Sequence, residues 1–174
     1  MHIRTIQIND FPDVAVLIRE AFTPTDFGYG NEAELVEKIR LSKEYVPTLE
    51  LVALEKEQIV GYGLLSEVQI INNKQNLTGL VLAPLAIDPN YQKQGIGKQL
   101  MYELEARAKQ LGYPFISILG HPTYYAQFGY LPAQNYQVTA PFEVPAEAFM
   151  LKVLASDRLK NIHGTLQYSS AFDE

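Results

Sequence analysis

The chain has 174 residues, no cysteine and a formal net charge of −6. The lack of cysteine excludes disulfides, thiolate catalysis and cysteine-based zinc sites, and the acidic balance argues against nucleic acid as a partner, because no basic stripe is present to neutralise phosphates. No apolar stretch reaches the ~18 residues of a membrane helix, and the N-terminus lacks the apolar region of a signal peptide. We therefore expect a single domain over residues 1–174, cytoplasmic and with no membrane partner.

The N-terminal part of the sequence predicts a strand and two helices. Residues 2–8 alternate polar and apolar side chains, as a strand does. Two capping side chains, at positions 9 and 10, precede apolar residues that share a helical face over residues 14–22. A second, short helix is predicted near residues 34–41.

The segment between these helices, TPTDFGYGNEAE at residues 23–34, contains Phe27, Tyr29 and two glycines. Functional loops often have this composition. An equally good interpretation is a helix–helix connection whose aromatic side chains pack back onto the core. The sequence leaves both interpretations open.

An antiparallel meander follows. Residues 49–56 and 58–70 are predicted strands around a tight turn, and residues 72–76 form the next hairpin loop. Residues 77–87 then form a long apolar strand that is interrupted by Pro84, which has no N–H to donate to a neighbouring strand. We expect a β-bulge at Pro84.

The most informative stretch is residues 82–100, LAPLAIDPNYQKQGIGKQL, which combines a strand, a loop with glycines and the start of a helix at residues 96–111. Gly95 and Gly97 have no Cβ, so the backbone is free to take positive φ and to let an anion approach closely. The unpaired N–H groups of the first helical turn, together with the helix dipole, favour negative charge at this loop. The pattern predicts a phosphate-binding loop.

The loop does not match the usual nucleotide motifs. From Gln92 its spacing reads QxxGxG. It is not a Walker loop, because Lys98 is followed by Gln99, and it is not a Rossmann pattern, because position 100 is Leu. Lys93 and Lys98 either add positive charge for the phosphate or are ordinary exposed lysines. A nucleotide site of the Walker or Rossmann type is therefore disfavoured.

The C-terminal part predicts fewer regular elements. Gly112 ends the helix, and residues 114–120 form the next strand. Residues 121–130, HPTYYAQFGY, are typical of a short helix or turn. Residues 136–154 predict an irregular strand with an acidic helical turn, and the tail to Glu174 shows no strong pattern.

Residues 82–100, followed by LGYPFISILGHPTYYAQFGYLPA at residues 111–133, resemble the GNAT superfamily of N-acetyltransferases. Its central motif is a strand, a pyrophosphate loop of the form R/Q-x-x-G-x-G/A, and a helix. The resemblance is closer still to small bacterial acetyltransferases with a GHPxYYxxFGF-like segment, and it extends from Ile3 to residues 141–154. It implies an α/β (α+β) fold with a mixed central sheet of about six to seven strands, a bulged and splayed fourth strand, and about four flanking helices.

The resemblance implies acetyl-CoA as co-substrate, and no cluster of His, Asp and Glu has the spacing of a metal site. Leu85 and Ile87 would contribute main-chain groups to the pantetheine arm, and the N–H of Leu85 or Ala86 would polarise the acetyl carbonyl. The pyrophosphate would be bound by the main-chain N–H groups of Gln92, Lys93, Gln94, Gly95, Ile96, Gly97 and Lys98.

In this family the proton for the departing thiolate commonly comes from a Tyr four residues before the Gly of a YxxxGF pattern. Tyr125 precedes Gly129 by four residues, with Tyr130 in place of the Phe. The resemblance therefore implies that Tyr125 is the general acid. Two alternatives stay open: Tyr125 is a packing aromatic, or the acid is Tyr124, for which we expect a packing role.

Three further residues are candidates for the acceptor site. Phe27 and Tyr29 border it by analogy of position. His121 stands where many relatives carry an Asn that contacts the cofactor, and its imidazole is suited to relaying a proton, although a lone His after a strand is more often structural. No direct base is identified, because residues 77–87 contain no acid and Glu67 is better explained by a solvated strand face.

The resemblance implies an acetyl-CoA-dependent N-acetyltransferase. It would act on a primary amine of a small molecule or protein by direct attack in a ternary complex, since no cysteine and no serine elbow motif is present to form a covalent intermediate. The alternative is a non-catalytic acyl-CoA-binding or regulatory module of the same fold. The acidic surface favours cationic acceptors, and related folds often dimerise through the C-terminal strands, so a homodimer is a further expectation.

Overall fold

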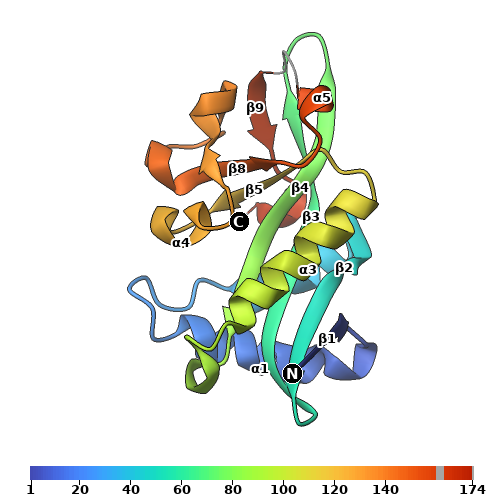
Figure 1. Cartoon of the computed structure of the whole chain (residues 1–174), viewed down its shortest axis with the longest axis vertical. Coiled ribbons are helices and arrows are strands. Elements are labelled where there is room, and N and C mark those ends of the chain that lie inside the picture. The colour runs from blue at the N-terminus through green and yellow to red at the C-terminus, as the bar shows by residue number, and fades with distance from the viewer. Residues whose placement is uncertain (160–162, 174) are drawn as a thin grey trace. The chain divides into compact units, whose positions relative to one another are not determined.

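The computed structural model describes residues 1–159 and 163–173 (Figure 1). Within them the chain divides into two compact units, of which the first contains Met1–Ser66 and Ala83–Arg107 and the second contains Glu67–Leu82 and the chain from Ala108 onward. The expectation of one domain over residues 1–174 stays a prediction. Three elements contribute residues to both units: β3 (Gln58–Ile71), β4 (Asn76–Ile87) and α3 (Ile96–Gln110).

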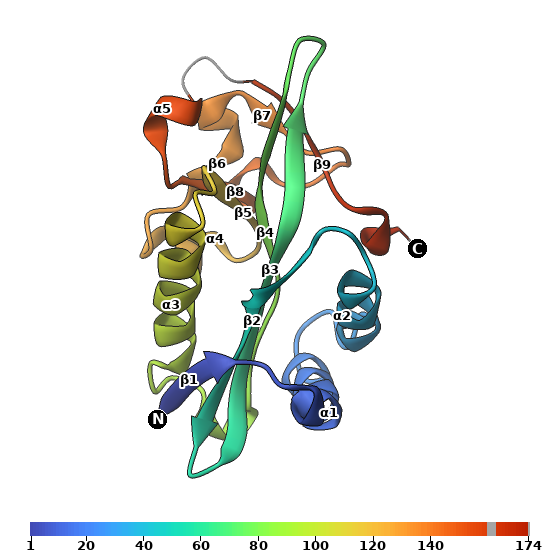
Figure 2. The same ribbon diagram turned by 90° about the vertical axis from the view of Figure 1, so that its right-hand side faces the viewer.

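The first unit is an antiparallel sheet with helices on both faces. Strand β1 pairs with β2, and β2 pairs with the first part of β3. Figure 2 shows α1 and α2 on one face of these strands and α3 on the other. Its remaining elements are β1 (His2–Thr5), α1 (Phe11–Phe22), α2 (Glu32–Arg40) and β2 (Tyr45–Glu55).

Two element bounds in this unit differ from prediction. Strand β1 ends at Thr5 instead of residue 8, because the chain turns at Ile8–Asp10, where the Asp10 carboxylate accepts a hydrogen bond from the Gln7 N–H at 2.7 Å. Strand β2 begins at Tyr45 instead of residue 49. Its register shifts before Glu50, which interrupts the alternation that marks a strand in the sequence.

Helix α3 lies unusually close to β3. A Cβ atom on Gly61 would stand 2.9 Å from both Ile96 Cγ2 and Leu100 Cδ1, and a Cβ on Gly63 would stand 2.8 Å from Leu104 Cδ1. Real Cβ atoms do not approach other atoms so closely, so a side chain at either position would force these neighbours to move. The two glycines therefore set the distance between the helix and the sheet.

A buried carboxylate joins α2 to the sheet. Glu50 of β2 is 0% exposed and accepts hydrogen bonds from Arg40 Nη2 at 2.6 Å and Nε at 2.9 Å. The hydroxyls of Tyr62 and Tyr45 donate to the same carboxylate at 2.8 and 2.5 Å. Burial, followed by the proximity of Glu50, raises the pKa of Tyr62. The carboxylate thus accepts four hydrogen bonds from three side chains, as a buried charge requires.

The second unit is a mixed sheet. Strand β4 runs parallel to β5, β5 runs antiparallel to β8, and β8 runs antiparallel to β6. The last part of β3 pairs with β9, which also pairs with β7. Its elements are β5 (Phe115–Leu119), α4 (Pro122–Ala126), β6 (Leu131–Pro132), β7 (Val138–Thr139), β8 (Phe149–Val153), α5 (Ser156–Leu159) and β9 (Gly164–Gln167).

The mixed α/β fold is confirmed, with nine strands in the described part of the chain instead of six to seven. Two of the strands, β6 and β7, have only two residues each. The third unforeseen strand, β9, lies in the tail that shows no sequence pattern, and its Leu166 is buried against Val68 and Ile70. The ladder between β4 and β5 comprises Leu80↔Ile116 and Val81↔Ser117. The Ala83–Pro84 bond is cis, while the predicted bulge and splay of this strand stay predictions.

We expect Gly61→Val to lower the free energy of unfolding by about 1–3 kcal/mol, because the new side chain must displace Ile96 and Leu100 together. Urea denaturation measures this change. Gly30→Val is the matched control in an exposed loop, and we expect it to stay within about 0.5 kcal/mol of the parent. Equal losses in the two variants would contradict the close helix–strand packing.

Candidate functional site

The predicted phosphate loop begins where β4 ends. The N–H of Asp88 donates to the Val60 carbonyl at 2.9 Å, which attaches the loop to β3. The Asp88 carboxylate accepts from the Asn90 N–H at 2.8 Å, and the Tyr91 N–H donates to the Asp88 carbonyl at 2.8 Å. Asp88 thus initiates the short turn Pro89–Tyr91, as its sequence context predicts.

The loop contains two left-handed residues. Gly95 has φ +86° and Lys93 has φ +63°. No protein atom lies within 4 Å of the position that a Cβ of Gly95 would take, so this backbone is open to an approaching group. Gly97 is the second residue of α3 and has no positive φ, so the expectation of positive φ holds for Gly95 and is wrong for Gly97. The reason is that the chain must turn before the helix begins at Ile96.

The first turn of α3 faces this loop with hydrogen-bond donors. The Gln99 N–H donates to the Gly95 carbonyl at 3.1 Å, which closes the first helical turn. Helix geometry leaves the N–H groups of Ile96, Gly97 and Lys98 without an acceptor in a preceding turn. These donors and the helix dipole together favour an anion.

The polar side chains of the loop support its shape or stay in solvent. Gln92 donates to the Ile87 carbonyl at 3.4 Å, and Gln94 donates to the Asn90 carbonyl at 3.5 Å. Lys93 and Lys98 are both exposed, and the Lys98 ammonium lies 5.9 Å from the centroid of the Tyr102 ring. Leu85, Ala86 and Ile87, the residues expected to contact the pantetheine and the acetyl group, form the last three residues of β4, and Ala86 is buried.

Tyr125 lies in the second unit, on α4. Its ring packs on Gly120, where a Cβ would stand 2.6 Å from Tyr125 Cε2. The rings of Tyr124 and Tyr130 contact it edge-on, at centroid distances of 4.9 and 6.1 Å. Burial, with a smaller contribution from Tyr124, raises the pKa of Tyr125. Its phenol therefore stays protonated at neutral pH, which is the state that a proton donor needs.

The neighbours of Tyr125 differ in exposure. Tyr124 is 37% exposed and packs edge-on against Phe128 at 5.5 Å, in agreement with the packing role that we expected. His121 stands at the N-cap of α4 with an exposed side chain, and its carbonyl accepts from the Tyr125 N–H at 3.2 Å. A main-chain hydrogen bond thus joins the N-cap residue His121 to Tyr125 in the first turn of α4.

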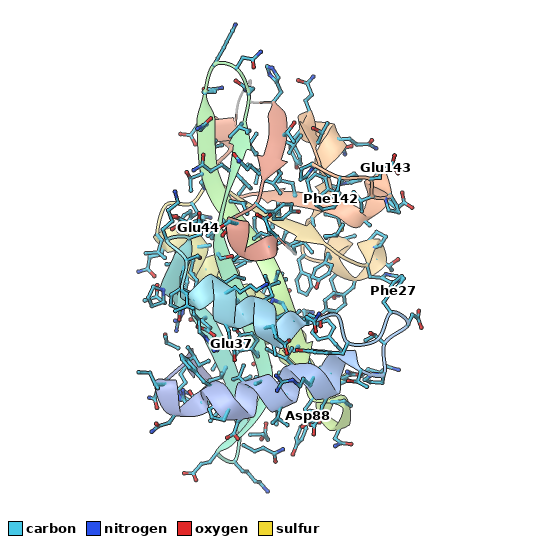
Figure 3. The ribbon with its side chains drawn as sticks, turned by 180° about the vertical axis from the view of Figure 1, so that it is seen from behind. Phe27, Glu37, Glu44, Asp88, Phe142 and Glu143 are labelled. Atoms are coloured by element: carbon cyan, nitrogen blue, oxygen red, sulfur yellow. The ribbon has the colours of Figure 1, made fainter. Side chains whose placement is uncertain are left out.

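The two aromatic residues of the loop between α1 and α2 have different surroundings. Phe27 is 100% exposed and projects from the loop (Figure 3). The Tyr29 hydroxyl bonds to the Glu34 carboxylate and accepts from the Ala33 N–H at 3.0 Å, which fixes it to the first turn of α2. The connecting-loop interpretation therefore fits Tyr29, whereas Phe27 does not pack back onto the core.

Glu67 corrects one expectation. We expected this residue to lie on a solvated strand face. Instead its side chain is partly buried, and its carboxylate accepts a hydrogen bond from the Tyr113 hydroxyl at 2.6 Å. Burial and this hydrogen bond raise the pKa of Tyr113. Forty-six positions separate the two residues, so no local pattern in the sequence indicates their contact.

In residues 1–159 and 163–173, no group of three or more His, Asp or Glu side chains is placed to hold a metal ion. No helix in the same residues is long and apolar enough to cross a membrane.

The fold is of the α/β class, and its loop after β4 combines a left-handed glycine with the first N–H groups of a helix, a geometry that favours an anion. Residues 13–130 match the model of the acetyltransferase (GNAT) family. This match covers more than half of the chain, and the chain therefore belongs to the GNAT family.

Relatives of similar length support this assignment. The uncharacterized N-acetyltransferase YhbS of Escherichia coli K12 is 32% identical over 94% of this chain and 93% of its own. A crystal structure of Escherichia coli YhbS in complex with CoA has a TM-score of 0.87, covering 99% of this chain and 92% of that one. A GNAT acetyltransferase from Brucella melitensis in complex with acetyl-CoA is 27% identical, with a TM-score of 0.79, covering 99% and 97% of the two chains.

We expect Gly95→Ala to cost about 1–2 kcal/mol of stability, because an L-residue is strained at φ +86°. Gly95→Asn should cost less, since Asn tolerates the left-handed region. Gln94→Ala is the control in the same loop and should stay within about 0.5 kcal/mol. Urea denaturation of the three variants tests the order, and an equal stability of the Ala and Asn variants would contradict it.

Proposed function

We propose that this protein transfers the acetyl group of acetyl-CoA to a primary amine of a small molecule or protein, by direct attack in a ternary complex. The observation that carries the proposal is the loop from Gln92 to Lys98, with its left-handed Gly95 and the free N–H groups of α3, in a chain of the GNAT family. The CoA and acetyl-CoA complexes of YhbS and of the Brucella protein support it.

The residues of the loop fit a pyrophosphate. Its donors are main-chain N–H groups of residues 92–98, which suit phosphate oxygens, and the open backbone at Gly95 lets these oxygens come close. Residues 89–102 contain Lys93 and Lys98 and no Asp or Glu, so the local charge is positive in a chain whose net charge is −6. This charge complements a dianionic group.

The chemistry of the transfer divides among three groups of the chain. Acetyl-CoA supplies the activated acetyl group as a thioester. The main chain of Leu85 and Ile87 binds the pantetheine arm, and the N–H of Leu85 or Ala86 polarises the carbonyl as the amine nitrogen bonds to its carbon. The carbon–sulfur bond then breaks, and the sulfur takes a proton from the Tyr125 hydroxyl.

The amine attacks in its neutral form, and the proton on its nitrogen leaves to water once the bond to the carbonyl carbon has formed. Residues 77–87 contain no acid, and the Glu67 carboxylate is engaged by Tyr113. An amine that reaches the site already neutral needs no base within the protein, and the phenol of Tyr125 regains its proton from solvent. The expected homodimer is no part of this scheme.

We expect the parent protein to bind acetyl-CoA and not ATP, because the loop lacks the Walker and Rossmann glycines. Gly97→Glu should abolish acetyl-CoA binding by placing a carboxylate against the pyrophosphate. Isothermal titration calorimetry measures both, and circular dichroism of the variant checks that it is folded. Unchanged affinity in a folded Gly97→Glu variant would show that the loop is not the site.

We expect Tyr125→Phe to lower kcat by about 10²-fold or more with little change in the Kd for acetyl-CoA, because the proton donor is lost. Gly120→Ala should also lower kcat, since the methyl group displaces the Tyr125 ring. Tyr124→Phe is the control and should keep its activity. A free-thiol assay over a panel of amines measures turnover.

Full activity of Tyr125→Phe would remove Tyr125 from this role. Binding of acetyl-CoA by the parent protein without turnover on any amine would instead favour the non-catalytic module of the same fold.

A further inference from the structure

The second unit contains a small pocket between β7 and β8. Its cavity volume is about 280 Å³, slightly below the range of about 300–1,000 Å³ that is usual for pockets of drug-sized ligands. Its apolar lining includes Phe142, Val144 and Phe149, and its polar lining consists of Gln134, Thr139 and Glu143. The size and lining suit a small molecule with an aliphatic body.

One wall of this pocket is held by the C-terminal tail. The Phe142 ring stacks on Tyr168 at a centroid distance of 5.8 Å and an angle of 22°, and Tyr168 contacts Phe172 at 5.2 Å. Burial raises the pKa of Tyr168 to about 12. The row of rings restricts Phe142, which is 46% exposed and therefore presents ring surface to a ligand.

Glu143 gives the pocket its charge. It is the one charged residue in the lining, and it is adjacent to Phe142 on the segment before β8 (Figure 3). Residues 110–151 contain no Lys, Arg or Asp, and their two charged side chains are Glu143 and Glu147. Among the described residues, no ion pair joins Glu143 to a Lys or Arg. A carboxylate in a largely apolar pocket lining, with no cation near it in the sequence, complements an organic ammonium.

The pocket is connected to Tyr125 through two contacts. Ala148 lies between the lining residues Ala146 and Phe149, and its carbonyl accepts from the Gly120 N–H at 3.0 Å. Gly120 in turn lies under the Tyr125 ring. The pocket wall and the proposed proton donor are therefore linked by one hydrogen bond and one ring contact.

We infer that this pocket binds the acceptor and that the acceptor is a short aliphatic diamine, with one ammonium held by Glu143 beside the Phe142 ring. The inference rests on the proposed function. The attacking amine must be neutral, whereas a carboxylate stabilises the protonated form of an amine beside it. Glu143 therefore holds the second amino group, and the first is left to attack the thioester.

The test compares 1,5-diaminopentane with n-pentylamine, which has the same chain length and one charge less. We expect kcat/KM for the diamine to exceed that for the monoamine by about fivefold, the upper end for an exposed ion pair. E143Q should abolish this preference. E143K should lower kcat/KM for the diamine by about 25-fold, since attraction is replaced by repulsion of similar size.

The matched control is E147K, which changes the net charge equally at a residue outside the pocket lining. We expect it to change kcat/KM for the diamine less than about twofold, because Glu147 is exposed and solvent and salt screen its charge. Equal losses in E143K and E147K, or equal kcat/KM for the two amines with the parent protein, would overturn the inference.

Binding of 1,5-diaminopentane, followed by NMR of the protein without acetyl-CoA, separates this inference from the proposed function. Diamine binding that is lost in E143K supports the pocket even where no acetyl transfer occurs. Acetyl transfer that is insensitive to Glu143, without diamine binding, supports the function and overturns the pocket.

Discussion

The close approach of α3 to β3 is the constraint on which the proposed anion-binding loop depends. Ile96, the first residue of α3, lies 2.9 Å from the position that a Cβ of Gly61 would take, and the N–H of Asp88 at the other end of the loop bonds to the carbonyl of Val60. Both ends of the loop are thus attached to neighbouring residues of one strand. With its ends fixed, the chain must reverse within a few residues, and the left-handed conformations of Lys93 and Gly95 accomplish this.

The buried carboxylate of Glu50 has a different part in the same unit. Four hydrogen bonds from Arg40, Tyr45 and Tyr62 satisfy it, and the Arg40 guanidinium also lies 3.6 Å from the centroid of the Phe11 ring. The Glu50 side chain is 0% exposed and both of its carboxylate oxygens accept hydrogen bonds inside the unit, so it is not accessible to a substrate. We therefore interpret this cluster as the joint between α2 and the sheet.

The sequence predicts those features that are written in local patterns. The order of the main helices and strands, the turn at Asp88 and the left-handed Gly95 follow from periodicity and from residue types within a few positions. Contacts between residues that are far apart in the sequence cannot be predicted from such local patterns. The hydrogen bond of Tyr113 to Glu67 and the pairing of β9 with β3 each join positions far apart, and a four-residue strand such as β9 has too few side chains to show alternation.

The acetyl donor is easier to infer from the sequence than the amine that accepts the acetyl group, because main-chain groups recognise the first and side chains recognise the second. A pyrophosphate is bound by N–H groups that every residue except proline carries, so the sequence need only specify glycine and a helix start, and this pattern is shared across a family. An acceptor is selected by side chains, and the two that we infer to do so, Phe142 and Glu143, lie on a segment without regular secondary structure. The position of Phe142 depends on Tyr168, which follows directly on β9. The part of the chain with the weakest sequence pattern therefore holds the residues that would distinguish one amine from another.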